Sequence, residues 1–256
     1  MNEFELLAEL ERRGLIVGVE HDAAEIEGLV VTQDTLVEGV HFRFDLLDWR
    51  ELGFRAAAVN ISDLSASGAE PVALVVTFAA PILDGAIAFY EGMAETGVPV
   101  RGGDTTKADS VFITVTALGR AERVPGRAGA QPGDLLVVTG PLGGAGAAFR
   151  ESRLARPPIR TAEGRELARV AHAMLDISDG LGPDAGHIAR RSGCRLVIDL
   201  DRVPLAEGAT IDDLSFGEDY ELLAATPDPL GFTVIGRCEE GSGVVPVDLG
   251  GWEHFR

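Results

Sequence analysis

Apolar and polar positions in the first half of the chain follow helical and strand-like periods in turn. Helices are predicted over residues 2–13, 48–67 and 84–96, and strands over residues 28–34, 36–42, 71–79 and 110–119. A corner at Asp34 and Thr35 is expected between the first two strands. In the helix over 48–67, Asn60 and Asp63 fall on the face that packs inward, where a carboxylate is unusual.

The stretch 121–134 is rich in proline and glycine and has no periodic pattern, which predicts a boundary. Beyond it, helices are predicted over 142–150, 161–172 and 181–192, strands over 134–139, 195–200 and parts of 219–248, and a short strand or turn over 173–179. Both halves are rich in βα alternation, but neither resembles a doubly wound sheet. We therefore predict two α/β (α+β) domains, residues 1–126 and 127–256.

Composition and charge narrow the class of protein. The 256 residues are 46% hydrophobic, which is enough for a well-buried core, and the net charge is −19. Such a charge disfavours nucleic acid and anionic membrane as partners. No apolar run has the length of a membrane span, and the N-terminus is predicted to be an amphipathic helix rather than a signal peptide. Cys194 and Cys238 lack metal-ligand spacing, so a reducing, cytoplasmic setting is expected.

Seven aspartates stand beside small residues or apolar runs: Asp22, Asp34, Asp63, Asp104, Asp176, Asp179 and Asp184. Carboxylates in such settings suit hard cations such as Mg²⁺, although any single one could equally cap a helix or turn. Asp176 and Asp179 are expected on one face, where their like charges favour a cation between them. Because polyphosphates cannot approach clustered carboxylates without divalent ions, the set indicates a metal-dependent phosphate site.

Other motifs limit the kinds of phosphate site. No GxxxxGK[ST] loop occurs, and no GxGxxG follows the first strand. The glycine turn over 140–146 could bind an anion, but a tight strand-to-helix turn explains it better. The segment 101–106, RGGDTT, offers close backbone approach, a carboxylate and hydroxyls, with a plain β-turn as the alternative. No nucleophile elbow supports serine catalysis.

Nine segments, taken in order, resemble the thiamine-monophosphate kinase family, within the aminoimidazole-ribotide-synthetase-like ATP-binding superfamily. They are EFELL (3–7), HDAAEI (21–26), VTQDTLVEGVHF (31–42), AAAVNISDLSASGAEP (56–71), GGDTT (102–106), RAGAQPGD (127–134), LDISDGLGPDAGHI (175–188), GEDYELL (217–223) and GWEHF (251–255). The resemblance implies an N-terminal sheet domain that dimerises through its strands, a C-terminal α/β domain, and ATP between them. His21 and Gln33 depart from the family pattern.

The resemblance also implies roles for individual residues. Those at Mg²⁺-ligand positions are Asp22, Thr32, Gln33, Asp34, Asp63, Asp104, Asp176 and Asp179. Those at ATP positions are Gly103, Asp104, Arg127 and Ser178, and those at thiamine-phosphate positions are His41, Glu218 and Trp252. Asp184 is expected to act at a helix start or to support a neighbouring metal ligand. An indole face suits a cationic ring, whereas a lone histidine such as His41 is more often structural.

The expected reaction is ATP-dependent phosphorylation of thiamine monophosphate to thiamine diphosphate by direct in-line transfer. Asp34 and Asp104 would act through several Mg²⁺ ions, and the acceptor phosphate needs no general base because it is already ionised. The alternatives are another ATP-using member of the superfamily or a non-catalytic homologue that binds Mg²⁺ or nucleotide. A selenophosphate synthetase is disfavoured because residues 1–18 contain no cysteine, and the hydrogenase-maturation relative because the chain ends without one.

Overall fold

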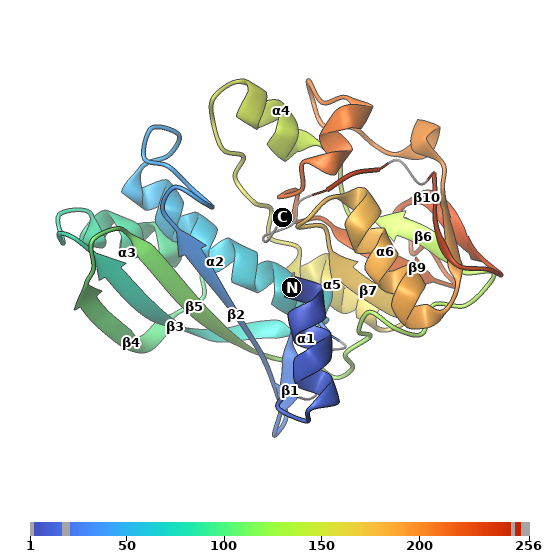
Figure 1. Ribbon diagram of the computed structural model, residues 1–256, viewed down its shortest axis with the longest axis horizontal. Helices are drawn as coiled ribbons and strands as arrows, with labels where there is room; N and C mark the ends of the chain where they lie inside the picture. Colours follow the sequence, from blue (N-terminus) through green and yellow to red (C-terminus); the bar gives the residue numbers. More distant parts are fainter. Residues whose placement is uncertain (1–2, 17–20, 247–248, 252–256) are drawn as a thin grey trace.

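The computed structural model describes residues 3–16, 21–246 and 249–251, and it contains two sheets, one in each half of the chain (Figure 1). The first sheet has the strand order β1-β2-β5-β3-β4. Its strands are β1 (Ala24–Ile26), β2 (Leu29–Val37), β3 (Glu70–Ala80), β4 (Val100–Lys107) and β5 (Phe112–Arg120). Only β3 and β4 run parallel among its neighbouring strands.

Two helices cover one face of this sheet, α2 (Trp49–Ala66) and α3 (Ala86–Ala94). The side chain of Asp48 accepts the Glu51 backbone N–H at 2.9 Å, which caps the start of α2. The two helices cross closely at Gly53. A Cβ added there would lie 1.8 Å from the Phe89 carbonyl oxygen, so the crossing requires a residue without a side chain. The opposite face of the sheet carries exposed or half-buried side chains.

The second sheet has the order β11-β8-β10-β6-β9-β7. Its strands are β6 (Leu135–Val138), β7 (Ala173–Asp176), β8 (Arg195–Ile198), β9 (Leu222–Thr226), β10 (Thr233–Glu239) and β11 (Gly243–Val245). The helices α4 (Gly144–Arg150), α5 (Thr161–Ala168) and α6 (Leu181–Ser192) accompany it, with short 3₁₀ helices at Leu200–Arg202 and Ile211–Ser215. The helix α1 (Glu3–Arg12) lies at the N-terminus.

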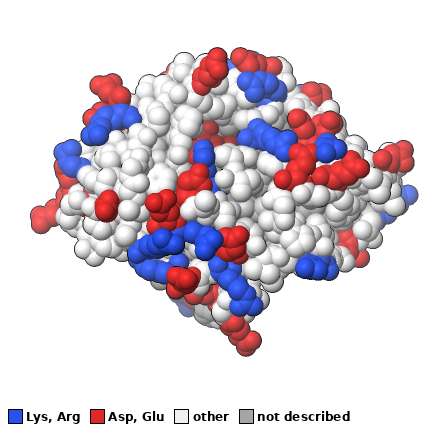
Figure 2. Space-filling view, turned by 180° about the vertical axis from the view of Figure 1, so that it is seen from behind, with Lys and Arg blue, Asp and Glu red and all other residues white. Residues whose placement is uncertain are grey.

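The helix α2 links the two halves, since its C-terminal part contacts β7 and α5 (Figure 1). Residues at this end of α2 therefore reach both sheets. None of the described helices is both long enough and apolar enough to cross a membrane. On the face seen in Figure 2, basic side chains lie among acidic ones.

The structure differs from the sequence-based expectations at two places in the first sheet. The expected corner at Asp34 and Thr35 does not exist, because β2 continues from Leu29 to Val37 and pairs without interruption with β5. The segment 101–106, for which a plain β-turn was the alternative to a phosphate-binding motif, is part of the edge strand β4. In both places hydrogen bonds to a neighbouring strand decide the conformation. The local sequence pattern does not predict that pairing.

Candidate active site

A cavity of about 870 Å³ lies between the two halves of the chain. Its wall includes Asp34 and His41 from the first half and Ser178, Asp179 and Glu218 from the second. Asp63 and Asp176 also line it, so carboxylates from both sheets meet at this cavity.

Three carboxylates form what we call the carboxylate cluster: the half-buried Asp22, the half-buried Asp63 on α2, and the buried Asp176 at the end of β7. Their oxygens all lie within 4.8 Å of one another. Neighbouring side chains fix them, since Thr32 Oγ1 donates to Asp63 and Ser62 Oγ donates to Asp176, each at 2.5 Å. Residues from four separate segments thus converge on one point.

Arg127 supplies the positive charge next to the cluster. Its Nε donates to Asp22 Oδ1 at 2.8 Å. The sequence placed Arg127 at an ATP phosphate, and in this structure its guanidinium is engaged by a carboxylate. A phosphate that reached Arg127 would therefore compete with Asp22 or share the guanidinium with it.

Burial raises the pKa of every member of the cluster, and the carboxylates repel one another. The pKa of Asp176 rises to about 7, mainly through burial and then through the charge of Asp22. The pKa of Asp63 lies well above its ordinary value for the same two kinds of reason, burial and the charges of Asp34, Asp176 and Asp22. Burial also raises the pKa of Asp22, although Arg127 opposes that shift. A bound cation would relieve both the desolvation and the repulsion.

Asp34 adjoins the cluster from β2. Its backbone N–H donates to Asn60 Oδ1 on α2 at 3.0 Å, which ties the strand to the helix. Burial, followed by the charge of Asp22, raises the pKa of Asp34 to about 6. The helical period predicted that Asn60 and Asp63 face inward. Asn60 accepts the Asp34 backbone N–H, and Asp63 belongs to the carboxylate cluster.

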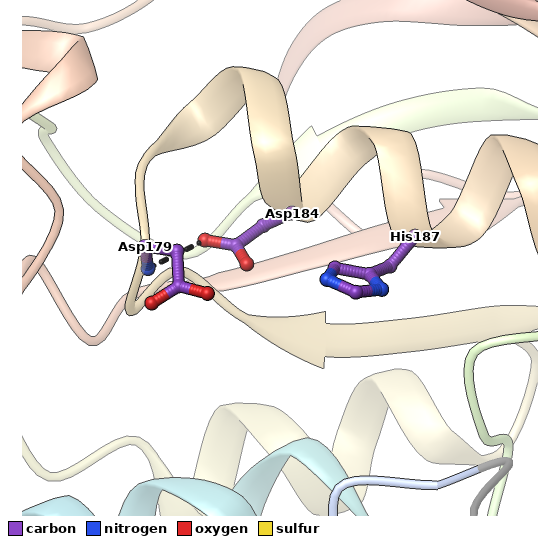
Figure 3. A group of neighbouring side chains, drawn as sticks. All are labelled: Asp179, Asp184 and His187. Atoms are coloured by element: carbon purple, nitrogen blue, oxygen red, sulfur yellow. Dashed lines mark hydrogen bonds between the residues drawn. The ribbon is translucent and has the colours of Figure 1, made fainter. Parts of the chain in front are cut away.

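A second group, Asp179, Asp184 and His187, lies at the start of α6 (Figure 3). Asp184 Oδ2 accepts the backbone N–H groups of Asp179 at 3.0 Å and Gly180 at 3.1 Å. This agrees with the helix-start role expected for Asp184. The segment that carries Asp176 and Asp179 is not extended throughout: β7 ends at Asp176, and the turn that follows places Asp179 in a different group, although both residues line the cavity.

The predicted ATP residues Gly103 and Asp104 do not meet the cluster within one chain. Asp104 on β4 lies opposite Thr77, which lies opposite Thr114 and then Thr35, so its side chain shares the open face of the sheet. Asp34, one residue from Thr35, faces the helices instead. Three strand spacings, about 14 Å in all, also separate β2 from β4.

Gln33 shares the open face with Asp104. Its side-chain oxygen accepts a hydrogen bond from Thr116 Oγ1 at 2.9 Å, whereas its neighbours Thr32 and Asp34 point inward. Consecutive residues of a strand face opposite sides, so the eight predicted ligands do not surround one site within a single chain. The metal roles of Gln33 and Asp104 stay predictions.

Of the predicted substrate residues, His41 and Glu218 both line the cavity. His41 Nδ1 accepts the Val37 N–H at 3.0 Å, and Glu218 forms an ion pair with the buried Arg55 at 2.7 Å. Trp252 lies outside the described residues. The prediction for Trp252 is therefore left open.

The backbone N–H groups of the glycine turn at 140–146 bind a carboxylate of the protein itself. Asp219 accepts the backbone N–H groups of Gly143 at 2.7 Å and Ala145 at 3.2 Å, where an external anion was considered. The structural explanation preferred from the sequence is thus confirmed. Sequence reasoning missed the site roles of Ser62 and Asp219, although each is adjacent to a residue that it had selected.

Comparison with known proteins defines the class first. The family model of the AIR synthase related protein, N-terminal domain, matches residues 20–121, and that of the C-terminal domain matches residues 131–244. The chain is thus an AIR synthase related protein with both of the domains typical of that class.

Individual relatives identify the family within this class. Thiamine-monophosphate kinase of Pyrococcus horikoshii is 35% identical over 89% of this chain and 86% of the relative. That of Salmonella typhimurium is 34% identical over 90% and 88%. The solved structure of AaThiL complexed with AMPPCP and TMP has a TM-score of 0.90 and 31% identity, covering 99% of this chain and 97% of that one. The chain belongs to the thiamine-monophosphate kinase family.

Proposed function

We propose that this protein transfers the γ-phosphate of ATP to thiamine monophosphate, which yields thiamine diphosphate and ADP. The relatives bear that name, and the structural neighbour was solved with AMPPCP and TMP. The observation that carries the proposal is the carboxylate cluster, which opens into a large cavity between the two halves. Two anionic substrates must meet there, and the buried carboxylates require a cation for that to happen.

The oxygen donors of the carboxylate cluster fit Mg²⁺. Asp22, Asp63 and Asp176, with Asp34 beside them, are hard oxygen ligands, and no sulphur or imidazole nitrogen belongs to the three-residue group. We propose that these four residues hold Mg²⁺. When bound, the ion supplies charge neutralisation and alignment of phosphate oxygens.

Other residues of the site hold the carboxylates in position. Thr32 and Ser62 donate to Asp63 and Asp176, so these carboxylates keep oxygens aimed at one point. The acceptor phosphate has a second pKa near ~6 and is already an oxyanion at neutral pH, so transfer needs no general base. The proposed transfer is direct and in line. Trapping a phosphorylated protein during turnover would refute it.

The activity is tested by ADP release coupled to a chromogenic reaction. Thiamine monophosphate is expected to support ADP release with Mg²⁺ and not with EDTA. Unphosphorylated thiamine and an aminoimidazole-ribotide precursor serve as controls for other kinase activities. ADP release that is equal with and without thiamine monophosphate would refute the proposed substrate.

We further propose that the protein is a homodimer, joined through the open face of the first sheet. Val75 is 38% exposed and Val100 is 36% exposed, so this part of the sheet keeps apolar area that a second copy would bury. Asp104 and Gln33 lie on the same face. Within one chain Asp34 faces the helices and Asp104 faces the open side of the sheet, so we propose that Asp104 acts on the site of the second copy rather than on that of its own chain.

Mixing two inactive variants tests this arrangement. Asp34→Asn and Asp104→Asn are each expected to lose most of kcat. If the two aspartates act across the dimer, a mixed dimer regains one intact site, and an equimolar mixture recovers roughly a quarter of wild-type activity by random pairing. No recovery after subunit exchange would place both aspartates in one chain and contradict the proposal. A cytoplasmic location is proposed as well, and the unpaired Cys194 and Cys238 agree with a reducing compartment.

A further inference from the structure

Arg55 is a buried cation outside the set of residues with an expected role. It lies on α2, two turns before Asp63, and its side chain is 3% exposed. Its Nη1 donates to the carbonyl oxygen of Ala155 at 2.8 Å, and its Nη2 lies 2.7 Å from Glu218 Oε1. An arginine removed from water in this way requires a counter-charge. Glu218 is the carboxylate paired with it among the described residues.

The contact at Glu218 is electrostatic rather than a directed hydrogen bond. Nη2 and Nε of Arg55 are buried and have no hydrogen-bond partner in the described part of the chain, so the 2.7 Å approach lacks good donor geometry. The guanidinium also lies 6.0 Å from the ring centroid of Tyr220. Arg55 is thus held between two residues of the cavity wall, one on each side of Asp219.

The loop that carries Glu218 is strained. Glu218 and Tyr220 have φ angles of 58° and 51°, a region that residues with a side chain rarely adopt. The backbone N–H groups of Glu218 and Tyr220 donate to the carbonyl oxygens of Ser178 and Ile177 at 2.8 and 2.9 Å. Such conformations persist where the surroundings hold them. The backbone bonds fix the loop, but among the described contacts only Arg55 fixes the carboxylate of Glu218.

We propose that Arg55 is a positioning residue for substrate recognition, holding the carboxylate of Glu218 at the cavity wall so that it can accept hydrogen bonds from the heterocyclic end of thiamine monophosphate. This proposal rests on the proposed function. Glu218 is 26% exposed and lines the cavity, so its carboxylate can contact a ligand while Arg55 remains buried behind it. Because Arg55 comes from the first half and Glu218 from the second, recognition depends on both halves being in register.

Kinetics of Arg55→Met, Arg55→Lys, Glu218→Gln and the Arg55→Met/Glu218→Gln double variant test the proposal. Glu218→Gln and Arg55→Met are each expected to raise the KM for thiamine monophosphate about tenfold, equivalent to about 1.4 kcal/mol, with the KM for ATP unchanged. The double variant is expected to resemble either single variant, because both changes disable one interaction. Arg55→Lys retains the charge and is expected to recover part of the affinity.

The matched control is Arg165→Met. Arg165 also joins the two halves, donating to Glu70 at 2.7 Å, but both side chains are more than half exposed and neither lines the cavity. All kinetic constants of this variant are expected to equal those of the wild type. If Arg165→Met shifts the KM for thiamine monophosphate as Arg55→Met does, a general loosening of the two halves explains both results, and the proposal is overturned.

Two further results would overturn it. One is a KM for thiamine monophosphate in the double variant that rises about 100-fold, the product of independent effects. The other is an equal loss of affinity for ATP and for thiamine monophosphate in Arg55→Met, which indicates a purely structural role. Should Arg55→Met fail to fold, Arg55→Lys decides: an unchanged KM for thiamine monophosphate contradicts the proposal, and a selective rise supports it. Failure of the proposed function is distinct, since wild-type protein would then show no ADP release with thiamine monophosphate.

Discussion

Replacing Asp176 with asparagine is expected to stabilise the metal-free fold and to abolish activity. Burial raises the pKa of Asp176 from the ordinary aspartate value of 3.8 to about 7 in the folded chain. Because the folded chain holds this proton more tightly than the unfolded chain does, stability is greatest at low pH and falls as pH rises through the interval from about 4 to 7. At pH 8 the full cost of ionising the buried carboxyl is present.

The size of the effect follows from the shift. Because the pKa rises from about 4 to about 7, ionised Asp176 lowers the free energy of unfolding by about 4 kcal/mol at pH 8 and by about 2 kcal/mol at pH 5. Asparagine is close in shape, and its side-chain oxygen can still accept the hydrogen bond that Ser62 donates to Asp176. Since Asp22 and Asp63 share in the titration of the cluster, we expect Asp176→Asn to gain at least about 2 kcal/mol at pH 8.

Urea unfolding in EDTA at pH 8 and pH 5 measures this gain. The variant is expected to be the more stable protein at pH 8, and the gap is expected to narrow at pH 5. Added Mg²⁺ should stabilise the wild type more than the variant, because binding to the folded state adds to its stability. A variant that is less stable than the wild type at pH 8, or a gap that does not depend on pH, would show that burial of Asp176 carries no electrostatic cost.

Two further substitutions test the packing around the site. Gly53→Ala places a methyl group 1.8 Å from the Phe89 carbonyl oxygen and is expected to lower the free energy of unfolding by about 3 kcal/mol. Gly102→Ala, with no atom within 4 Å of its Cβ, is the control, and equal losses in urea unfolding would contradict the close helix crossing. Asp219→Ala leaves the N–H groups of Gly143 and Ala145 without their acceptor and is expected to cost about 1–3 kcal/mol in the same measurement. An unchanged unfolding midpoint would mean that water replaces the carboxylate.

Much of the fold can be predicted from the sequence because local pattern and tertiary structure agree. The helix over 48–67 appears as α2 with Asp48 as its cap, and the strand over 71–79 appears within β3. Disagreement arises where pairing with another strand outweighs local preference. The glycines at 102 and 103 indicate a turn, but hydrogen bonding to β3 makes an edge strand of them.

For the site, the residue types could be predicted, but their grouping could not. Aspartates beside small residues were selected as candidate metal ligands, and Asp22, Asp63 and Asp176 among them do lie close together, because chemistry and local setting are visible in the sequence. Which of them meet depends on how α2 packs against β7, and no local signal contains that contact. The separation of Asp176 from Asp179, only three positions apart, shows the same limit.

The sequence by itself determined the family and the inward face of α2, and it predicted a cation-dependent chemistry, since each depends on residue types at short spacing. Only the tertiary structure decided that Asp34 and Asp104 face opposite sides of the sheet, because that depends on the register across β2, β5, β3 and β4. It also decided that Arg55 stands behind Glu218, which lies 163 positions further along the chain. The packing between the two halves sets which distant charges pair, and the local sequence pattern does not predict these pairs.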